Sequence, residues 1–307
     1  MGRRARHHSS LLLVAISAAS LTPRSSVVDA LSTSTAAASS CPFPGSQPGT
    51  SDHDKAVFRR QTGQTAPAEA AVGVPSTCSC RHGFPQAFAM DPVTSKGRRI
   101  NSGLIKLSCP HLVRAVDELE DEGSIGMMNG MVEKSDELQR SMVLTHELHA
   151  KVRREMLNGN NKNDVDEEDE NGGQGAVGDI LRKKLGEKGA ESFLSSGVAG
   201  ASAGSTEDVK CLHAWLGDYL FRGPALLGAD DGNVDASVAM GYTVAQALVE
   251  RGVDVSGTGG CQSLCDPSSN SLPLPPRPRN KQRLKTGKEI ARRKRRRKEG
   301  EGNTGKV

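Results

Sequence analysis

The sequence has few aromatic residues: Phe, Trp and Tyr make up 3% of its 307 residues, with a single Trp. Hydrophobic residues reach 36%, below the ~45–50% of globular domains, a figure that also counts Gly. A chain of this length holds one or two domains, but its hydrophobic residues are too few to form a packed core over the whole chain. We therefore expect a small ordered core within long flexible segments. No stretch reaches the ~18 uninterrupted apolar residues of a membrane helix, which argues against an integral membrane span in the mature chain.

The common signatures of catalysis are also missing. There is no phosphate-binding loop, no dinucleotide fingerprint and no Gly-x-Ser-x-Gly elbow. His146 and His149 are three residues apart, whereas the zinc-protease motif needs four, so we expect them at solvated or core positions. The acidic run within residues 158–178 lacks the spacing of an EF-hand and predicts a disordered insertion. Whether the chain is an enzyme is therefore left open.

The first 40 residues have the pattern of a targeting leader. Residues 1–10 hold three Arg and no acid, and Leu11–Leu21 is an apolar run, which is typical of a signal peptide. Residues 22–51 are rich in Ser, Thr and Ala, as in a transit peptide. The two parts together resemble the presequence of algae with complex plastids. We predict a plastid location, with mitochondrion, secretory pathway and nucleus as alternatives.

The C-terminal end is strongly basic. Residues 277–307 hold 14 Lys and Arg against three acidic residues, although the whole chain carries only +4. Seven basic residues follow one another: Arg292, Arg293, Lys294, Arg295, Arg296, Arg297 and Lys298. Such a run binds nucleic acid or another polyanion without reading sequence, and that is the predicted partner. A nuclear localisation signal and a solvated tail without a specific role stay open.

Between these ends we predict one folded domain, at residues 78–228. Residues 41–77 are polar and rich in Pro, Gly and Ala, which predicts a disordered linker. Residues 229–276 are predicted to be a weakly structured linker, and residues 277–307 a disordered tail.

The predicted fold class is α+β: a small, mostly helical domain with a short β-hairpin, flanked by disordered termini. Residues 82–88 and 103–108 favour the two strands. Apolar residues at helical spacing, with Pro110 in a first turn and Thr206 as a cap, favour helices. These cover residues 110–123, 132–157, 180–194 and 206–223, with a weaker helix at 236–250.

Seven cysteines are present, and several lie next to histidines. The short words are Cys78-Ser79-Cys80-Arg81-His82, Cys109-Pro110-His111 and Cys211-Leu212-His213. Each opens or flanks an expected element, so their side chains could converge on one tetrahedral zinc ion. The spacing matches no zinc finger, and scattered buried thiols are the alternative. For Cys261 and Cys265, a local disulfide and free thiols are both open.

Three blocks of the sequence resemble a protein family. They are residues 80–88 (CRHGFPQAF), 104–123 (LIKLSCPHLVRAVDELEDEG) and 209–220 (VKCLHAWLGDYL). They resemble domain of unknown function 501, which has a Cys-x-x-Gly-x-Pro opening, a strand ending in Cys-Pro, an amphipathic helix and a Lys-Cys-Leu-His word. The resemblance covers about 78–228. Two features depart from the family: the acidic insertion, and Ala225–Gly228 in place of an Asn-Pro word. Because the family has no established activity, the resemblance implies a domain and not a function.

The resemblance implies a ligand set for a metal ion, most simply zinc: Cys80, Cys109, Cys211 and His213, with Cys78 as an alternative ligand. Residues i and i+2 of a helix point about 200° apart. If Thr206 caps the last helix, Cys211 and His213 therefore cannot share an ion, whereas a start near Lys210 lets both reach it. A further alternative is a thiol redox protein centred on Cys109, since a helix N-terminus favours a thiolate.

Overall fold

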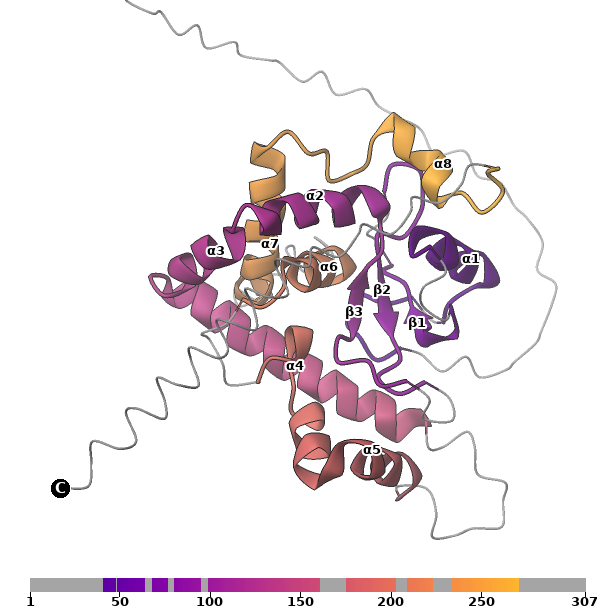
Figure 1. The fold of residues 1–307 in the computed structure, drawn as a ribbon, viewed down its shortest axis with the longest axis vertical. Helices are drawn as coiled ribbons and strands as arrows, with labels where there is room; N and C mark the ends of the chain where they lie inside the picture. Colours follow the sequence, from indigo (N-terminus) through magenta and orange to yellow (C-terminus); the bar gives the residue numbers. More distant parts are fainter. Residues whose placement is uncertain are drawn as a thin grey trace, which may run out of the picture. The chain divides into compact units, whose positions relative to one another are not determined.

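The computed structural model describes residues 41–47, 49–63, 68–76, 80–94, 99–160, 175–202, 209–222 and 234–270, and these all belong to one compact unit. A small sheet lies among helices (Figure 1). The predicted leader, Cys78, Thr206 and the basic residues 292–298 lie outside the described residues. In the described part, no helix is long and apolar enough to cross a membrane.

The sheet has three short antiparallel strands in the order β1-β2-β3. They are β1 (Ala71–Gly73), β2 (Ala87–Met90) and β3 (Ile105–Leu107). The predicted hairpin is confirmed: β2 pairs with β3, with Ala87 opposite Leu107 and Ala89 opposite Ile105. All four residues of β2 are buried, because this central strand is covered on both faces.

Successive side chains of β2 serve two different cores, as the alternation of a strand requires. Phe88 and Met90 pack with Val57 and Phe58 of α1 (Asp52–Gln61). Ala87 and Ala89 pack with residues of α4 (Asp136–Asn160) and α6 (Leu212–Arg222), among them Phe221. Alanine on this face lets the helices approach the sheet closely.

The largest core lies between helices. Leu112, Val116 and Leu119 of α2 (Pro110–Asp121) pack with Trp215 and Leu216 of α6, with α3 (Ser124–Val132) and with α7 (Val234–Glu250). The predicted helix at 110–123 is therefore confirmed, with Pro at its first position. The expected amphipathic segment at 180–194 lies in α5 (Gly175–Leu194), and the weaker helix at 236–250 lies in α7.

Two helix boundaries differ from the prediction. The helix expected at 132–157 is α4, which begins at Asp136, and the short helix α3 before it was not expected; the Ser135 hydroxyl accepts from the N–H of Leu138 at 3.3 Å and caps α4. The helix expected from Thr206 begins only at Leu212. The helix begins there because a residue of α2 caps it: the Glu120 carboxylate accepts from the Leu212 N–H at 2.7 Å.

The segments predicted as linkers are also partly folded. Within residues 41–77, Ser51 forms a capping box with Asp54 and starts α1, whose Val57 and Phe58 are fully buried against the sheet. Within 229–276, α7 is followed by the short helix α8 (Gln262–Cys265). Cys261 and Cys265 are both buried there. A few apolar residues are enough to fold these segments, because they pack against a hydrophobic surface of the predicted domain.

Candidate metal centre

The predicted ligands fall into two groups at opposite ends of α2. Cys109 directly precedes this helix, whereas Cys211 and His213 lie beside Glu120 in its last turn. Eleven residues of helix separate the two ends by about 16 Å. The structure thus brings Cys211 and His213 together but does not bring Cys80 and Cys109 to the same point.

Glu120, Cys211 and His213 form a compact group of possible ligands. One donor atom from each lies within 4.8 Å of the other two. The Cys211 Sγ is 3.9 Å from the His213 Nδ1, which is 3.3 Å from the Glu120 Oε1. Glu120 is buried and the other two residues are half-buried, so the group lies at the edge of the core.

The late start of α6 makes this arrangement possible. Cys211 precedes the helix and His213 lies in its first turn, so the i, i+2 geometry of a regular helix does not apply to the pair. Glu120 is held in place because its Oε1 also accepts from the N–H of Leu212. One carboxylate therefore both caps α6 and faces the thiol and the imidazole.

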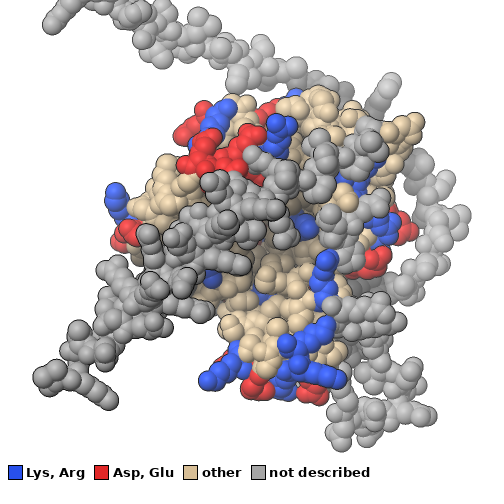
Figure 2. Space-filling model, viewed as in Figure 1, with Lys and Arg blue, Asp and Glu red and all other residues tan. Residues whose placement is uncertain are grey.

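The electrostatic setting of the group is acidic. The His213 Nε2 donates to the Val113 carbonyl at 3.2 Å and lies 3.5 Å from the Asp117 carboxylate. Burial alone lowers the pKa of His213, but hydrogen bonds to Cys211 and Glu120 and the charges of both raise it to about 10. Figure 2 shows acidic side chains gathered over α2, a field that attracts cations.

Cys80 and Cys109 lie in different surroundings. Cys80 starts a tight turn: its N–H donates to the Phe84 carbonyl, and its own carbonyl accepts from Gly83. Burial raises the pKa of the Cys109 thiol to about 12, although backbone N–H groups of the first helical turn lower it. Cys109 therefore keeps its proton at neutral pH, which does not favour a nucleophilic or redox role.

Comparison with known protein families identifies the family of the domain. A family described as "Protein of unknown function (DUF501)" matches residues 76–229. The chain belongs to this family. No curated protein and no solved structure matches it. The DUF501 match includes Cys80, Cys109, Glu120, Cys211 and His213 and ends before Cys261 and Cys265.

Sequence reasoning missed Glu120. Its acidic neighbours Glu118 and Asp121 are exposed, and the spacing of the apolar residues predicts an exposed position for Glu120 as well. In the DUF501 structure it is 7% exposed, because its partners are Leu212 and His213, more than 90 residues away. No local signal distinguishes such a residue from an ordinary exposed helix glutamate.

The sequence also gave no sign of a buried polar network within the DUF501 core. A core or a solvated position was expected for His149, and the structure places this residue in the core. Its Nε2 donates to Asp218 of α6 at 2.8 Å, and the Asp218 carboxylate also accepts from the Nε and the Nη2 of Arg222. This network fastens α4 to α6 beside the sheet.

Proposed function

We propose that this DUF501 protein is a metal-binding protein that holds a divalent ion, most simply zinc, through Glu120, Cys211 and His213. The observation that carries the proposal is the meeting of one thiol, one imidazole and one carboxylate within 4.8 Å. These are the three side-chain donors that zinc takes in proteins.

The distances support a tetrahedral site. Zinc bonds of about 2.0–2.3 Å place neighbouring donor atoms roughly 3.3–3.6 Å apart. The Nδ1 of His213 is 3.3 Å from the Glu120 Oε1 and 3.9 Å from the Cys211 Sγ. A small rotation of the thiol brings all three donors within bonding range of one ion.

The surroundings of His213 support the same assignment. Its Nδ1 faces the other two ligands, whereas its Nε2 donates to Val113 and lies near Asp117. Metal-bound histidines generally have a carbonyl or carboxylate on the second ring nitrogen, which fixes the tautomer and the ring orientation. Asp117 and the Val113 carbonyl thus orient the imidazole toward the ion.

Three protein ligands leave one tetrahedral position for water or a substrate. This is the pattern of catalytic zinc sites, whereas structural sites have four protein ligands. The half-buried position of Cys211 and His213 gives that fourth position access to solvent. When bound, zinc supplies a Lewis acid and an activated water there.

The test measures zinc per chain in the full-length protein purified under reducing conditions, together with zinc affinity by chelator competition. Cys211→Ser and Glu120→Gln should each remove one equivalent and lower affinity on the order of 100-fold, since losing even an outer partner costs 10–100-fold. Glu120→Gln keeps the acceptor that caps α6. Glu118→Gln, an exposed acid on the same helix, is the matched control and should bind as the parent does. Parental stoichiometry and affinity in Cys211→Ser and Glu120→Gln would overturn the proposal.

A further inference from the structure

We propose that Cys80, Cys109, Cys261 and Cys265 form a second metal site, a zinc ion held by four thiolates, that fastens residues 254–265 to the DUF501 domain. This site is separate from Glu120, Cys211 and His213 and does not depend on them. Two of its ligands, Cys80 and Cys109, lie within the family match, and the other two lie beyond its end.

The four cysteines come from three separate parts of the chain and are all buried and free of disulfide bonds. Cys80 and Cys265 belong to one hydrophobic cluster. A Cβ atom on Gly257 would lie 3.3 Å from the Cys261 Sγ and 3.6 Å from the Cys80 Cβ, so these two residues flank the same point. Cys109 is buried at the start of α2, two residues before His111, which contacts Asp254 in the segment that carries Cys261.

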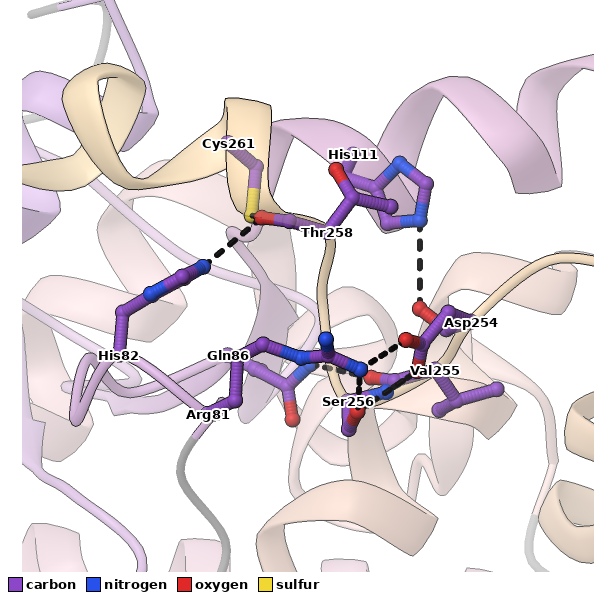
Figure 3. Close-up of polar contacts among 9 residues, drawn as sticks. All are labelled: Arg81, His82, Gln86, His111, Asp254, Val255, Ser256, Thr258 and Cys261. Atoms are coloured by element: carbon purple, nitrogen blue, oxygen red, sulfur yellow. Dashed lines mark hydrogen bonds and ion pairs between the residues drawn. The ribbon is translucent and has the colours of Figure 1, made fainter.

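Polar contacts tie the segment that carries Cys261 to the turn that carries Cys80 (Figure 3). The N–H of Arg81 donates to the Ser256 carbonyl at 2.8 Å, and the His82 Nε2 donates to the Thr258 carbonyl at 2.8 Å. The Arg81 guanidinium also pairs with Asp254. The residues that directly follow Cys80 therefore hold the 254–258 segment in place.

The same segment is tied to the start of α2, next to Cys109. The His111 Nε2 donates to the Asp254 carbonyl at 3.2 Å, as Figure 3 shows, and the Gln86 amide donates to the Val255 carbonyl at 2.6 Å. Each cysteine thus lies within two residues of a contact to this segment or belongs to it. These contacts bring together the chain segments that carry the four cysteines, although nothing in the spacing of the cysteines along the sequence indicates it.

Zinc binding has to displace the thiol proton of the buried Cys109, and the position of this residue directly before α2 helps, because a helix N-terminus favours a thiolate. Cys261 directly precedes α8 and Cys265 ends it, so the two are one helical turn apart and share a face.

Zinc binding requires the four sulfurs to move closer together. Among the described residues, no three of these sulfurs lie within 4.8 Å of one another. In the present arrangement the Cys261 Sγ donates to the Thr258 carbonyl at 3.0 Å, and the Cys265 Sγ accepts from Gln61 at 3.4 Å. On zinc binding each thiol loses its proton as a Zn–S bond of about 2.3 Å forms, which draws the four sulfurs together.

The experiment counts zinc per full-length chain, purified under reducing conditions, for the parent, Cys265→Ser, Cys211→Ser and the double variant. We expect two equivalents for the parent, one for each single variant and none for the double variant. Cys41→Ser changes a free thiol outside the group and should keep two. A parent with one equivalent that only Cys265→Ser removes supports this site and refutes the other.

Two results would overturn the inference: zinc content that Cys265→Ser leaves unchanged, or an intact mass showing a disulfide between two of the four cysteines in the zinc-loaded protein. Cys261→Ser is the second variant in case Cys265→Ser fails to fold, which the fluorescence of the buried Trp215 reports. A readout beyond metal content is proteolysis within residues 251–270. Chelation should expose this segment in the parent and in Cys211→Ser, and the segment should already be open in Cys261→Ser; equal protection in all samples contradicts the proposed role.

Discussion

The buried ion pair between Asp218 and Arg222 gives the sharpest test of how the DUF501 core is held together. Asp218 is 1% exposed and Arg222 2% exposed. The Arg222 Nε lies 3.0 and 3.1 Å from the two carboxylate oxygens, and His149 donates to the same carboxylate at 2.8 Å. Burial raises the pKa of Asp218, but the charge of Arg222 and the hydrogen bond from His149 outweigh it and hold the pKa below its usual range.

Asp218→Ala removes the carboxylate and leaves the guanidinium of Arg222 buried without its counter-charge. Breaking one partner of a buried pair costs about 3–5 kcal/mol in the free energy of unfolding. The double variant Asp218→Leu with Arg222→Met removes both charges at similar volume, which is often close to neutral. It leaves the His149 Nε2 without its acceptor, at about 1–3 kcal/mol. The double variant should therefore be more stable than Asp218→Ala alone.

The assay is urea unfolding at neutral pH with zinc in excess, followed by the fluorescence of Trp215, the one tryptophan of the chain. Asp179→Asn is the control, because Asp179 forms an exposed ion pair with Arg182 and such pairs contribute about 0–1 kcal/mol. A double variant as unstable as Asp218→Ala would refute the reasoning. So would a loss below about 1 kcal/mol in Asp218→Ala, since it would mean that water reaches the pair.

Two further predictions concern helix packing. Val198 donates to the Nδ1 of the fully buried His146, and burial lowers the pKa of this histidine from 6.5 to about 4. As the pH falls, the unfolded chain therefore takes up the proton first, so the free energy of unfolding should fall by about 2 kcal/mol between pH 7 and pH 5. Urea unfolding of His146→Asn should lack this part of the loss. If the variant shows the same dependence on pH as the parent, the assignment is contradicted. A Cβ on Gly241 would lie 2.5 Å from the Trp215 carbonyl, so Gly241→Ala should lower the free energy of unfolding by about 1–3 kcal/mol. Gly126→Ala, where a Cβ meets nothing within 4 Å, should not, and equal thermal midpoints for the two variants would contradict a tight crossing of α6 and α7.

The parts of the fold that the sequence predicted are those with local causes. The helix at 110–123 has an apolar stripe of Leu112, Val116 and Leu119 behind a proline at its first position, and each of these signals acts within a few residues. Of the two hairpin strands, β3 lies within the expected range 103–108, where apolar and polar residues alternate, whereas β2 overlaps the range 82–88 only at Ala87 and Phe88. In both cases the pattern needs no knowledge of the partner surface to be recognised.

The parts that the sequence did not predict have distant causes. α1 offers only Val57 and Phe58 to the core, and such a pair means little until β2 presents Phe88 and Met90 to it. The start of α6 depends on a carboxylate from α2. Helix propensity near Thr206 carries no information about the carboxylate that caps α6, and the residues of α1 carry none about β2, because these contacts join residues that are many tens of positions apart.

The grouping of the cysteines was beyond sequence reasoning for the same physical reason. The words Cys109-Pro110-His111 and Cys211-Leu212-His213 look alike, and both flank a helix start, so the sequence allows both to supply ligands to one ion. The length of α2 separates them, because Cys109 lies at the N-terminal end of this helix and Glu120, which contacts His213, lies at its C-terminal end. In the two sites proposed above, each end of α2 takes its remaining donors from a part of the chain outside these two words. At one end this is an acidic residue indistinguishable from its exposed neighbours. At the other end it is the pair Cys261 and Cys265, which becomes informative only when the contacts of residues 254–258 bring it beside Cys80.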